Sequence, residues 1–260
     1  MISMMPYSDQ WWWWPGGSPQ GHRPVLFFPP AGADQTIVRP LVHHLAGTRL
    51  GALRMPGRGL RRSEPAPARM EPVIDEIATS IATMTGPAPV LVGHSFGGLL
   101  AFAVAQELDR RGTPPARLVA VASTAPHAWE DRLAEIGGVD EDDYVERRTR
   151  QLMADGAVPK ELADHPELGA ATREALATDV RMSYRAFITT PLSCPITAIT
   201  ARDDDLVDRE ASALWHKATN AAIDELTVPG GHFFYREHPL LLARLLLGEL
   251  TQLDGAYHGD

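Results

Sequence analysis

The segment Gly93–Gly97, with the sequence GHSFG, holds the residues best suited to chemistry. It follows a short apolar run typical of a strand, Val90–Val92, and precedes an apolar run of helical type that starts at Leu99. A serine at a strand-to-helix turn adopts a strained backbone conformation, which exposes its hydroxyl at the helix N-terminus. The flanking glycines must be small because strand and helix nearly touch there. This pattern predicts that Ser95 is a nucleophile that carries an acyl group.

A serine hydroxyl becomes reactive only when a histidine removes its proton and a carboxylate orients that histidine. In hydrolases with this turn, the acid and then the histidine follow the serine, each after a later strand. Of the ten histidines, only His232 follows a predicted terminal strand, after the turn Pro229–Gly231. The acid comes from Asp203–Asp205, directly after the apolar run Ile196–Thr200. We therefore predict His232 as the base and favour Asp204 as the acid, with Asp205 and then Asp203 as alternatives.

The same chemistry requires two backbone N–H groups that stabilise an oxyanion. One donor is expected at Phe96, the residue after the nucleophile, and the other in the loop after an earlier strand. The segment Phe27–Gly32 is such a loop, and Ala31 is the expected donor. The alternative for this loop is a plain proline-glycine turn.

Short strand-like runs alternate with helical patterns along the chain, which predicts an α/β fold with a mostly parallel central sheet and helices on both faces. Strands are expected at 25–28, 51–55, 90–92, 118–122, 196–200 and 225–228, and helices at 37–46, 72–84, 96–111, 209–218 and 239–253. We expect one domain over residues 1–260.

One segment, residues 127–190, shows no strand pattern and is here called the insert. Its polar, helix-forming runs at 142–154 and 170–187 predict a helical cap over the edge of the sheet that carries the site, although a purely structural excursion would look similar. If the insert is a cap, apolar side chains within it should line the acyl channel. The candidates are Leu152, Met153, Leu176, Met182 and Phe187.

The composition narrows the function class. A hydrophobic fraction of 44% is that of an ordinary globular protein, and a net charge of −9 argues against nucleic-acid binding, which needs a basic surface. Cys194 is the single cysteine, so no intrachain disulfide is possible. Without an apolar run of membrane length or a secretory leader pattern, a cytoplasmic protein is expected.

Several motifs together resemble one family. They are FPPAG (28–32), MPGRGLRRSEP (55–65), GHSFGG (93–98), CPITAITARDDDLV (194–207) and PGGHFF (229–234). On these motifs the chain is similar to the type II thioesterases of polyketide and non-ribosomal peptide biosynthesis, which have the α/β-hydrolase fold. The family's G-x-x-D-x-x-V frame falls on Asp204, with Ala201 in place of the usual glycine. Pro30 stands where the family usually has histidine.

The resemblance implies a serine thioesterase that hydrolyses acyl or aminoacyl groups from the phosphopantetheine arm of a carrier protein, without a metal or organic cofactor. Carrier proteins are generally acidic, so docking on this acidic chain would require a local basic patch. Two sets of arginines are candidates, Arg58, Arg61 and Arg62 in one and Arg147, Arg148 and Arg150 in the other.

Other functions use the same residues. A small-molecule esterase or lipase would prefer free oxyesters, whereas an acyltransferase or cyclase would pass the acyl group to a hydroxyl or amine. A non-catalytic homologue that only binds a partner is a third alternative. The run Trp11–Trp14 is expected to pack over a sheet edge or to offer an apolar surface to a partner.

Overall fold

A twisted sheet forms the centre of the protein. The computed structural model describes residues 10–17, 22–129, 138–184 and 190–257, which together form a seven-stranded sheet in the order β1-β3-β2-β4-β5-β6-β7. The strands are β1 (Trp12–Trp13), β2 (Pro24–Phe28), β3 (Arg49–Leu53), β4 (Val90–His94), β5 (Arg117–Val121), β6 (Ile196–Ala201) and β7 (Ile223–Val228). Only the pair of β1 and β3 is antiparallel among these strands. The predicted parallel sheet is confirmed.

Helices cover both faces of the sheet, and its inner strands are therefore buried on both sides. Leu26 and Phe28 of β2 enter one core cluster, while Val25 and Phe27 enter the other. The first cluster includes α3 (Met70–Ala82), α4 (Phe96–Arg110) and η3 (Leu214–Ala218). The second includes η1 (Gln35–Val38), α2 (Arg39–Val42), α10 (Phe234–Glu237) and α11 (Pro239–Tyr257). This two-sided arrangement explains why the strands read as continuous apolar runs.

The tryptophan run forms the edge of the sheet. Trp12 and Trp13 pair with β3, and the buried indole of Trp12 donates a hydrogen bond to Ser80 Oγ at 2.8 Å. The ring of Trp11 lies under the guanidinium of Arg61, with 4.4 Å between the guanidinium carbon and the ring centroid. Of the two predicted roles, packing at the sheet edge is therefore correct for Trp11 and Trp12. The sequence analysis did not predict the strand itself.

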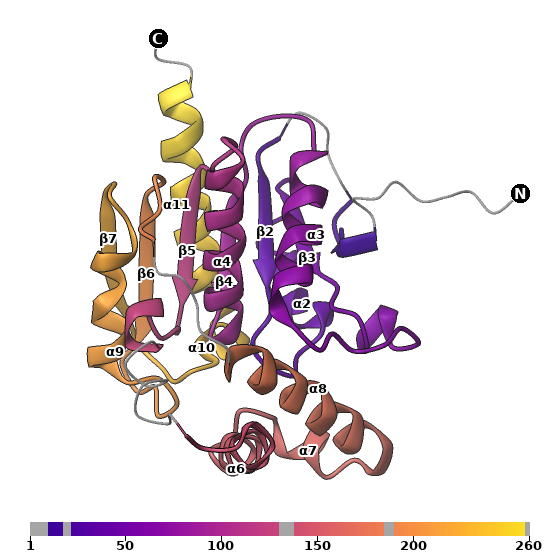
Figure 1. Cartoon of the computed structure of the whole chain (residues 1–260). Helices are drawn as coiled ribbons and strands as arrows, with labels where there is room; N and C mark the ends of the chain where they lie inside the picture. The colour runs from indigo at the N-terminus through magenta and orange to yellow at the C-terminus, as the bar shows by residue number, and fades with distance from the viewer. Residues whose placement is uncertain (1–9, 18–21, 130–137, 185–189, 258–260) are drawn as a thin grey trace, which may run out of the picture.

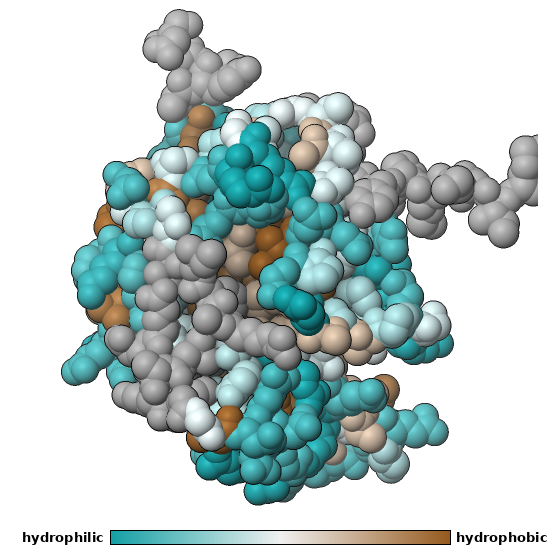
Figure 2. Space-filling view, in the orientation of Figure 1, coloured by the Kyte–Doolittle hydropathy of each residue, from teal (hydrophilic) through white to brown (hydrophobic). Residues whose placement is uncertain are grey.

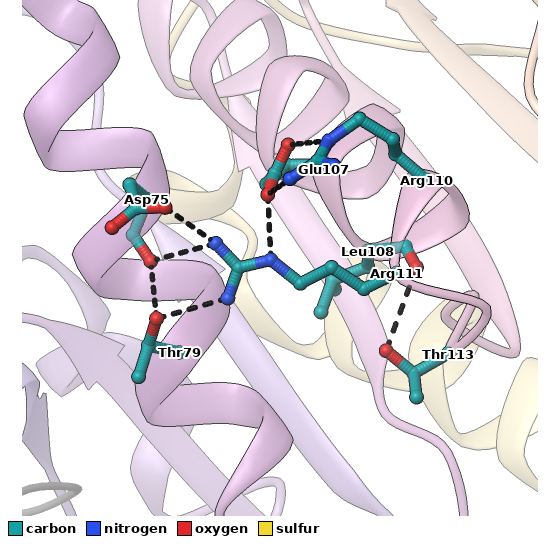
Figure 3. Close-up of polar contacts among 7 residues, drawn as sticks. All are labelled: Asp75, Thr79, Glu107, Leu108, Arg110, Arg111 and Thr113. Atoms are coloured by element: carbon teal, nitrogen blue, oxygen red, sulfur yellow. Dashed lines mark hydrogen bonds and ion pairs between the residues drawn. The ribbon is translucent and has the colours of Figure 1, made fainter.

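Arg111 ties the C-terminal end of α4 to α3 (Figure 3). Its guanidinium donates to Glu107 at 2.6 Å, to Thr79 Oγ1 at 2.9 Å and to Asp75 at 2.7 Å. The hydrogen bond from Arg110, together with that from Arg111, lowers the pKa of Glu107 to about 2. These charged groups hold α4, which begins at the predicted nucleophile, against its neighbouring helix.

In its described part, residues 127–129, 138–184 and 190, the insert contains the helical residues 127–129 and three further helices, α6 (Glu141–Ala154), α7 (Lys160–Ala163) and α8 (Pro166–Tyr184). In Figure 1 these three helices lie together beyond one end of the strands. Their own buried cluster contains Tyr144, Val145 and Leu176, and Ala31 packs against it. Figure 2 shows hydrophilic residues on the outer surface over α6. The insert thus adds a separate small core beside the loop that carries Ala31.

Shorter elements complete the chain: η2 (Gly59–Arg61) follows β3, and α9 (Arg209–Ala213) follows β6. In the part of the chain that the structure describes, we find no helix with the length and apolar character needed to span a membrane.

Candidate active site

Ser95 lies on the sharp turn between β4 and α4. Its backbone has φ 55° and ψ −121°, a conformation that costs about 1–3 kcal/mol for a residue with a side chain. Three hydrogen bonds hold it there. The Ser95 N–H donates to Val121 O at 2.9 Å, and the Ser95 carbonyl accepts from Gly98 N–H and Ser123 Oγ, both at 2.8 Å. The surroundings thus maintain the strained turn that the sequence pattern predicts.

The glycines of the turn are required by close backbone approach. A Cβ atom on Gly93 would overlap the carbonyl oxygen of Gly97, and one on Gly97 would overlap the carbonyl oxygen of Phe28 and lie 2.6 Å from that of Pro29. Real Cβ atoms essentially never show contacts below 3.0 Å. The loop after β2 therefore packs directly on the first turn of α4.

His232 and Asp204 form a pair after the last two strands of the sheet. The Nδ1 atom of His232 lies 2.9 Å from Oδ2 and 3.1 Å from Oδ1 of Asp204. Asp204 Oδ1 also accepts hydrogen bonds from the N–H groups of Leu206 and Val207 at 2.9 and 3.1 Å. Only about 5% of each side chain's surface is exposed to solvent. The carboxylate is therefore held in one orientation toward the imidazole.

The two neighbouring acids take other positions. Asp203 binds the turn before His232, because its carboxylate accepts from Gly230 N–H at 3.3 Å and its own N–H donates to Gly230 O at 2.9 Å. Asp205 is exposed. Of the three acids that the sequence left open, the structure brings Asp204 to His232.

A second histidine, His94, contacts the backbone of His232. His94, which is fully buried, donates from Nε2 to the backbone carbonyl of His232 at 2.9 Å and lies 3.3 Å through Nδ1 from the hydroxyl of Tyr235. Burial, and secondarily the nearby His232, hold the pKa of His94 well below its usual value. Burial also raises the pKa of Tyr235, so its hydroxyl remains a donor. His94 is thus a neutral imidazole that fixes the backbone of the His232 loop, a contact that the sequence analysis did not anticipate.

The two predicted oxyanion donors lie on either side of the contact between the β2 loop and α4. The Phe96 N–H is the first of α4 and has no acceptor within the helix. Ala31 lies in a four-residue turn closed by a hydrogen bond from Ala33 N–H to Pro30 O at 3.1 Å. Both residues line the cavity described next.

A cavity of about 80 Å³ connects these groups. Among the described residues, its wall includes Ser95, Phe96, Ala31 and His232, and the insert contributes Arg148, Leu152, Ala157, Asp179, Val180 and Ser183. The insert also contributes Trp129, and apolar side chains such as Leu99 form much of the rest of the wall. The site is therefore suited to an apolar acyl group next to a hydroxyl, an imidazole and two amides.

The predicted channel residues have different positions. Leu152 lines the cavity, whereas Leu176 belongs to the buried cluster of the insert and Met182 to a core cluster of the sheet. Met153 packs on the cluster of the insert, and Phe187 lies outside the described residues. The prediction is therefore wrong for Met153, Leu176 and Met182, because an amphipathic pattern does not say which core a helix face joins.

The predicted docking arginines near residue 60 are mostly internal. Arg58 is buried and pairs with the buried Asp179 of α8, and Arg61 is buried and pairs with Glu64. The expectation that Arg58 and Arg61 form an exposed basic patch is therefore wrong, while Arg62 is exposed. The sequence analysis did not single out Asp179. The sequence feature that could have indicated it is an acidic residue on the same helical face as Leu176 and Val180, where an apolar residue would be expected.

Comparison with known proteins agrees with this geometry. The thioesterase domain family matches residues 23–247. The chain belongs to the thioesterase family. The resemblance to thioesterases that the sequence motifs indicate is thereby confirmed at the level of the family.

Two relatives at 30% identity are thioesterases of biosynthetic pathways. One is a probable cadicidin biosynthesis thioesterase of Streptomyces griseus, 30% identical over 221 residues, which are 82% of this chain and 58% of the relative. The chain thus spans little more than half of that protein's length. The other is the solved structure of RedJ, from the prodiginine pathway of Streptomyces coelicolor, with 30% identity, a TM-score of 0.68 and 85% of each chain covered.

A second solved structure is similar over its whole length. It is the type II thioesterase BorB from the borrelidin biosynthetic cluster. The TM-score is 0.80, and the matched region covers 95% of this chain and 100% of the BorB chain. Because the identity is 24%, this likeness shows the fold alone. The predicted α/β-hydrolase fold is confirmed.

Proposed function

We propose that this chain is a serine thioesterase that removes acyl or aminoacyl groups from the phosphopantetheine arm of carrier proteins in polyketide or non-ribosomal peptide biosynthesis. The observation that carries the proposal is the Asp204–His232 pair, at 2.9 Å, in which His232 lines the same cavity as the strained Ser95. The thioesterase family match and the biosynthetic relatives support the thioester as the bond that is cleaved.

The reaction begins with proton transfer from the hydroxyl of Ser95 to Nε2 of His232. The Ser95 oxygen attacks the thioester carbonyl, and the carbonyl electrons move to its oxygen to give a tetrahedral oxyanion. When the carbonyl reforms, the carbon–sulfur bond breaks, and the pantetheine thiolate leaves with the proton from His232. The acyl group then remains on Ser95 as an ester.

Water completes the cycle. His232 takes a proton from water, the resulting hydroxide attacks the acyl-Ser95 carbonyl, and the proton returns to the oxygen of Ser95 as the free acid leaves. Asp204 keeps the proton of the neutral imidazole on Nδ1, so Nε2 is free to accept, and it stabilises the imidazolium that forms. The N–H groups of Ala31 and Phe96 stabilise both oxyanions.

The insert has the role of a cap in this proposal. Its helices α6 and α8 contribute Leu152, Val180 and other side chains to the wall of the cavity, opposite the sheet. A cap built from apolar side chains would exclude water from the acyl group and restrict its size. Its separate buried cluster supports this assignment.

An acyl carrier protein is the proposed partner. Its acidic surface would meet exposed arginines, of which Arg62, Arg147 and Arg150 remain candidates, together with Arg148 in the wall of the cavity. Such a partner is also consistent with the cytoplasmic location that we expect from the sequence.

Mass spectrometry of an acetyl-loaded carrier protein tests the proposal. We expect the wild-type protein to convert it to the free-thiol carrier and acetate, and Ser95→Ala to leave it unchanged. Hydrolysis of a nitrophenyl ester without cleavage of the carrier thioester would instead indicate an esterase. Transfer of the acetyl group to an added amine or alcohol in preference to water would indicate an acyltransferase. Absence of phosphonate labelling at Ser95 would indicate a non-catalytic homologue.

A further inference from the structure

A buried ion pair joins three segments beside the cavity of Ser95. Arg58 Nη1, from the loop after β3, lies 2.5 Å from Oδ2 of Asp179 on α8. The same Oδ2 atom accepts a hydrogen bond from Gly32 N–H at 2.8 Å. Asp179 is 1% exposed and Arg58 is 9% exposed. An ion pair this deeply buried is costly to form, so it is a poor explanation of stability alone.

The Gly32 N–H belongs to the central peptide of the turn that contains Ala31. The turn runs from Pro30 to Ala33, and the φ angle of +75° at Gly32 is that of the third residue of a type II turn. Type I and type II turns differ by a rotation of roughly 150–170° in the two angles beside the central peptide. Because Asp179 binds the N–H of this peptide, a flip would turn the carbonyl of Ala31 toward the carboxylate. Asp179 therefore fixes the orientation of this central peptide, which directly follows the peptide that carries the Ala31 N–H.

A second contact from the same face of α8 packs on this turn. Leu176 precedes Asp179 by three residues, and a Cβ atom on Gly32 would lie 3.1 Å from the Cβ of Leu176. The turn is thus held by an apolar contact and a charged hydrogen bond from a single helix of the insert. The residues just before the turn pack on the first turn of α4, where Gly97 meets the carbonyls of Phe28 and Pro29.

We propose that Asp179 is a positioning residue for oxyanion stabilisation, which holds the Ala31 amide beside that of Phe96 through its hydrogen bond to Gly32. Burial raises the pKa of Asp179, and the guanidinium of Arg58 opposes that rise. Because Asp179 belongs to α8, the oxyanion site is complete only when α8 is seated on the turn. The proposal rests on the function proposed above, in which Ala31 donates to the oxyanion.

Two substitutions at Asp179 separate positioning from stability. Asp179→Asn retains an oxygen that can accept from Gly32 N–H, whereas Asp179→Ala removes the acceptor, and both leave the charge of Arg58 unpaired. We expect both variants to lose stability by similar amounts. Removal of one oxyanion donor lowers kcat about 100- to 1000-fold, so displacement of the Ala31 amide in Asp179→Ala should lower kcat by about 10- to 100-fold with little change in KM. Because Asp179→Asn keeps an acceptor for the Gly32 N–H, its kcat should stay within about threefold of the wild-type value.

The assay uses an acetyl thioester of N-acetylcysteamine, together with the rate of Ser95 labelling by a fluorophosphonate, whose transition state also places charge on an oxygen. Arg111→Ala, which weakens the distant α3–α4 contact, is the control for lost stability and should keep kcat. If Asp179→Ala does not fold, the double variant Arg58→Met/Asp179→Ala removes both charges and should fold while kcat stays low.

Equal kcat values for Asp179→Ala and Asp179→Asn, or a wild-type kcat in the folded double variant, would overturn the positioning role. Failure of the proposed function looks different. In that case the wild-type protein itself would not cleave the thioester, while the labelling rates would still rank the Asp179 variants.

Discussion

The carboxylate of Asp204 lies 2.9 Å from Nδ1 of His232, although 27 residues separate the two in the sequence. Asp204 follows β6 and His232 follows β7, and these strands are parallel neighbours, so their carboxyl ends meet at one edge of the sheet. Asp203 strengthens this arrangement because it binds Gly230 in the turn before the histidine. The three consecutive acids thus have separate roles, and mutation can distinguish them.

Asp204→Asn should lower kcat far more than Asp203→Asn or Asp205→Asn. An amide at position 204 favours the wrong imidazole tautomer and cannot stabilise the imidazolium, and an equivalent change in another serine hydrolase lowers kcat by about 10⁴-fold. Thioester hydrolysis by the three purified variants measures the effect. A larger loss at position 205 would assign the acid to Asp205 instead.

Gly97→Ala should abolish activity and destabilise the fold. The added Cβ would overlap the carbonyl oxygen of Phe28, so the β2 loop and α4 would have to separate at the oxyanion site. Gly248→Ala is the matched control, since a Cβ there meets nothing within 4 Å and alanine in a helix is favoured by about 1 kcal/mol. Thermal unfolding and thioester hydrolysis of both variants test this. Normal activity in Gly97→Ala would show that the close approach is not required.

The free energy of unfolding should fall as the pH drops below the ordinary pKa of histidine, in part because of His94. Burial lowers the pKa of His94 in the folded chain below its value of 6.5, so between these values only the unfolded chain binds the proton. Acid therefore favours unfolding in this window. Replacing His94 with Gln should reduce the loss of stability between pH 7.0 and 5.5 by about 1 kcal/mol.

Urea unfolding at the two pH values, with wild type and His94→Gln in parallel, gives this difference directly. An identical pH dependence in the two proteins would mean that His94 titrates normally in the folded state. A steeper dependence in the variant would contradict the sign of the shift.

Leu152→Ala should change acyl selectivity, whereas Met182→Ala should change only stability. Leu152 lines the cavity, and each methylene accommodated in an apolar pocket is worth about 1–3 kcal/mol of discrimination. Met182 is buried in the core of the sheet, where truncation to alanine costs about 2–5 kcal/mol of stability. A series of thioesters with increasing acyl length, assayed with both variants, measures the shift toward longer chains. A uniform loss of rate across all lengths in Leu152→Ala would place the determinants of length elsewhere.

Much of the fold follows from local sequence patterns. The strands from β2 to β7 were predicted within two residues at each end, because β2 to β6 are short, mostly apolar runs bounded by turn residues and β7 mixes apolar and polar residues before a proline-glycine turn. The Ser95 turn was equally clear, since GHSFG between a strand and a helix leaves few alternatives. The order of serine, acid and histidine limited the rest of the site to one histidine and three acids.

Only the tertiary structure decided which long-range partners these residues meet. The strand within the tryptophan run could not be predicted from the local sequence. A strand of two residues is too short to show an alternating hydrophobic pattern, and it depends on its pairing with β3. Sequence spacing could not choose among Asp203–Asp205, since the choice depends on loop hydrogen bonds to residues 206, 207 and 230. Arg58 was likewise predicted to be a surface cation, because its partner Asp179 lies 121 residues away in the sequence. Local patterns determine the elements and the reactive turn, whereas burial and charge pairing depend on segments that meet only in the folded chain.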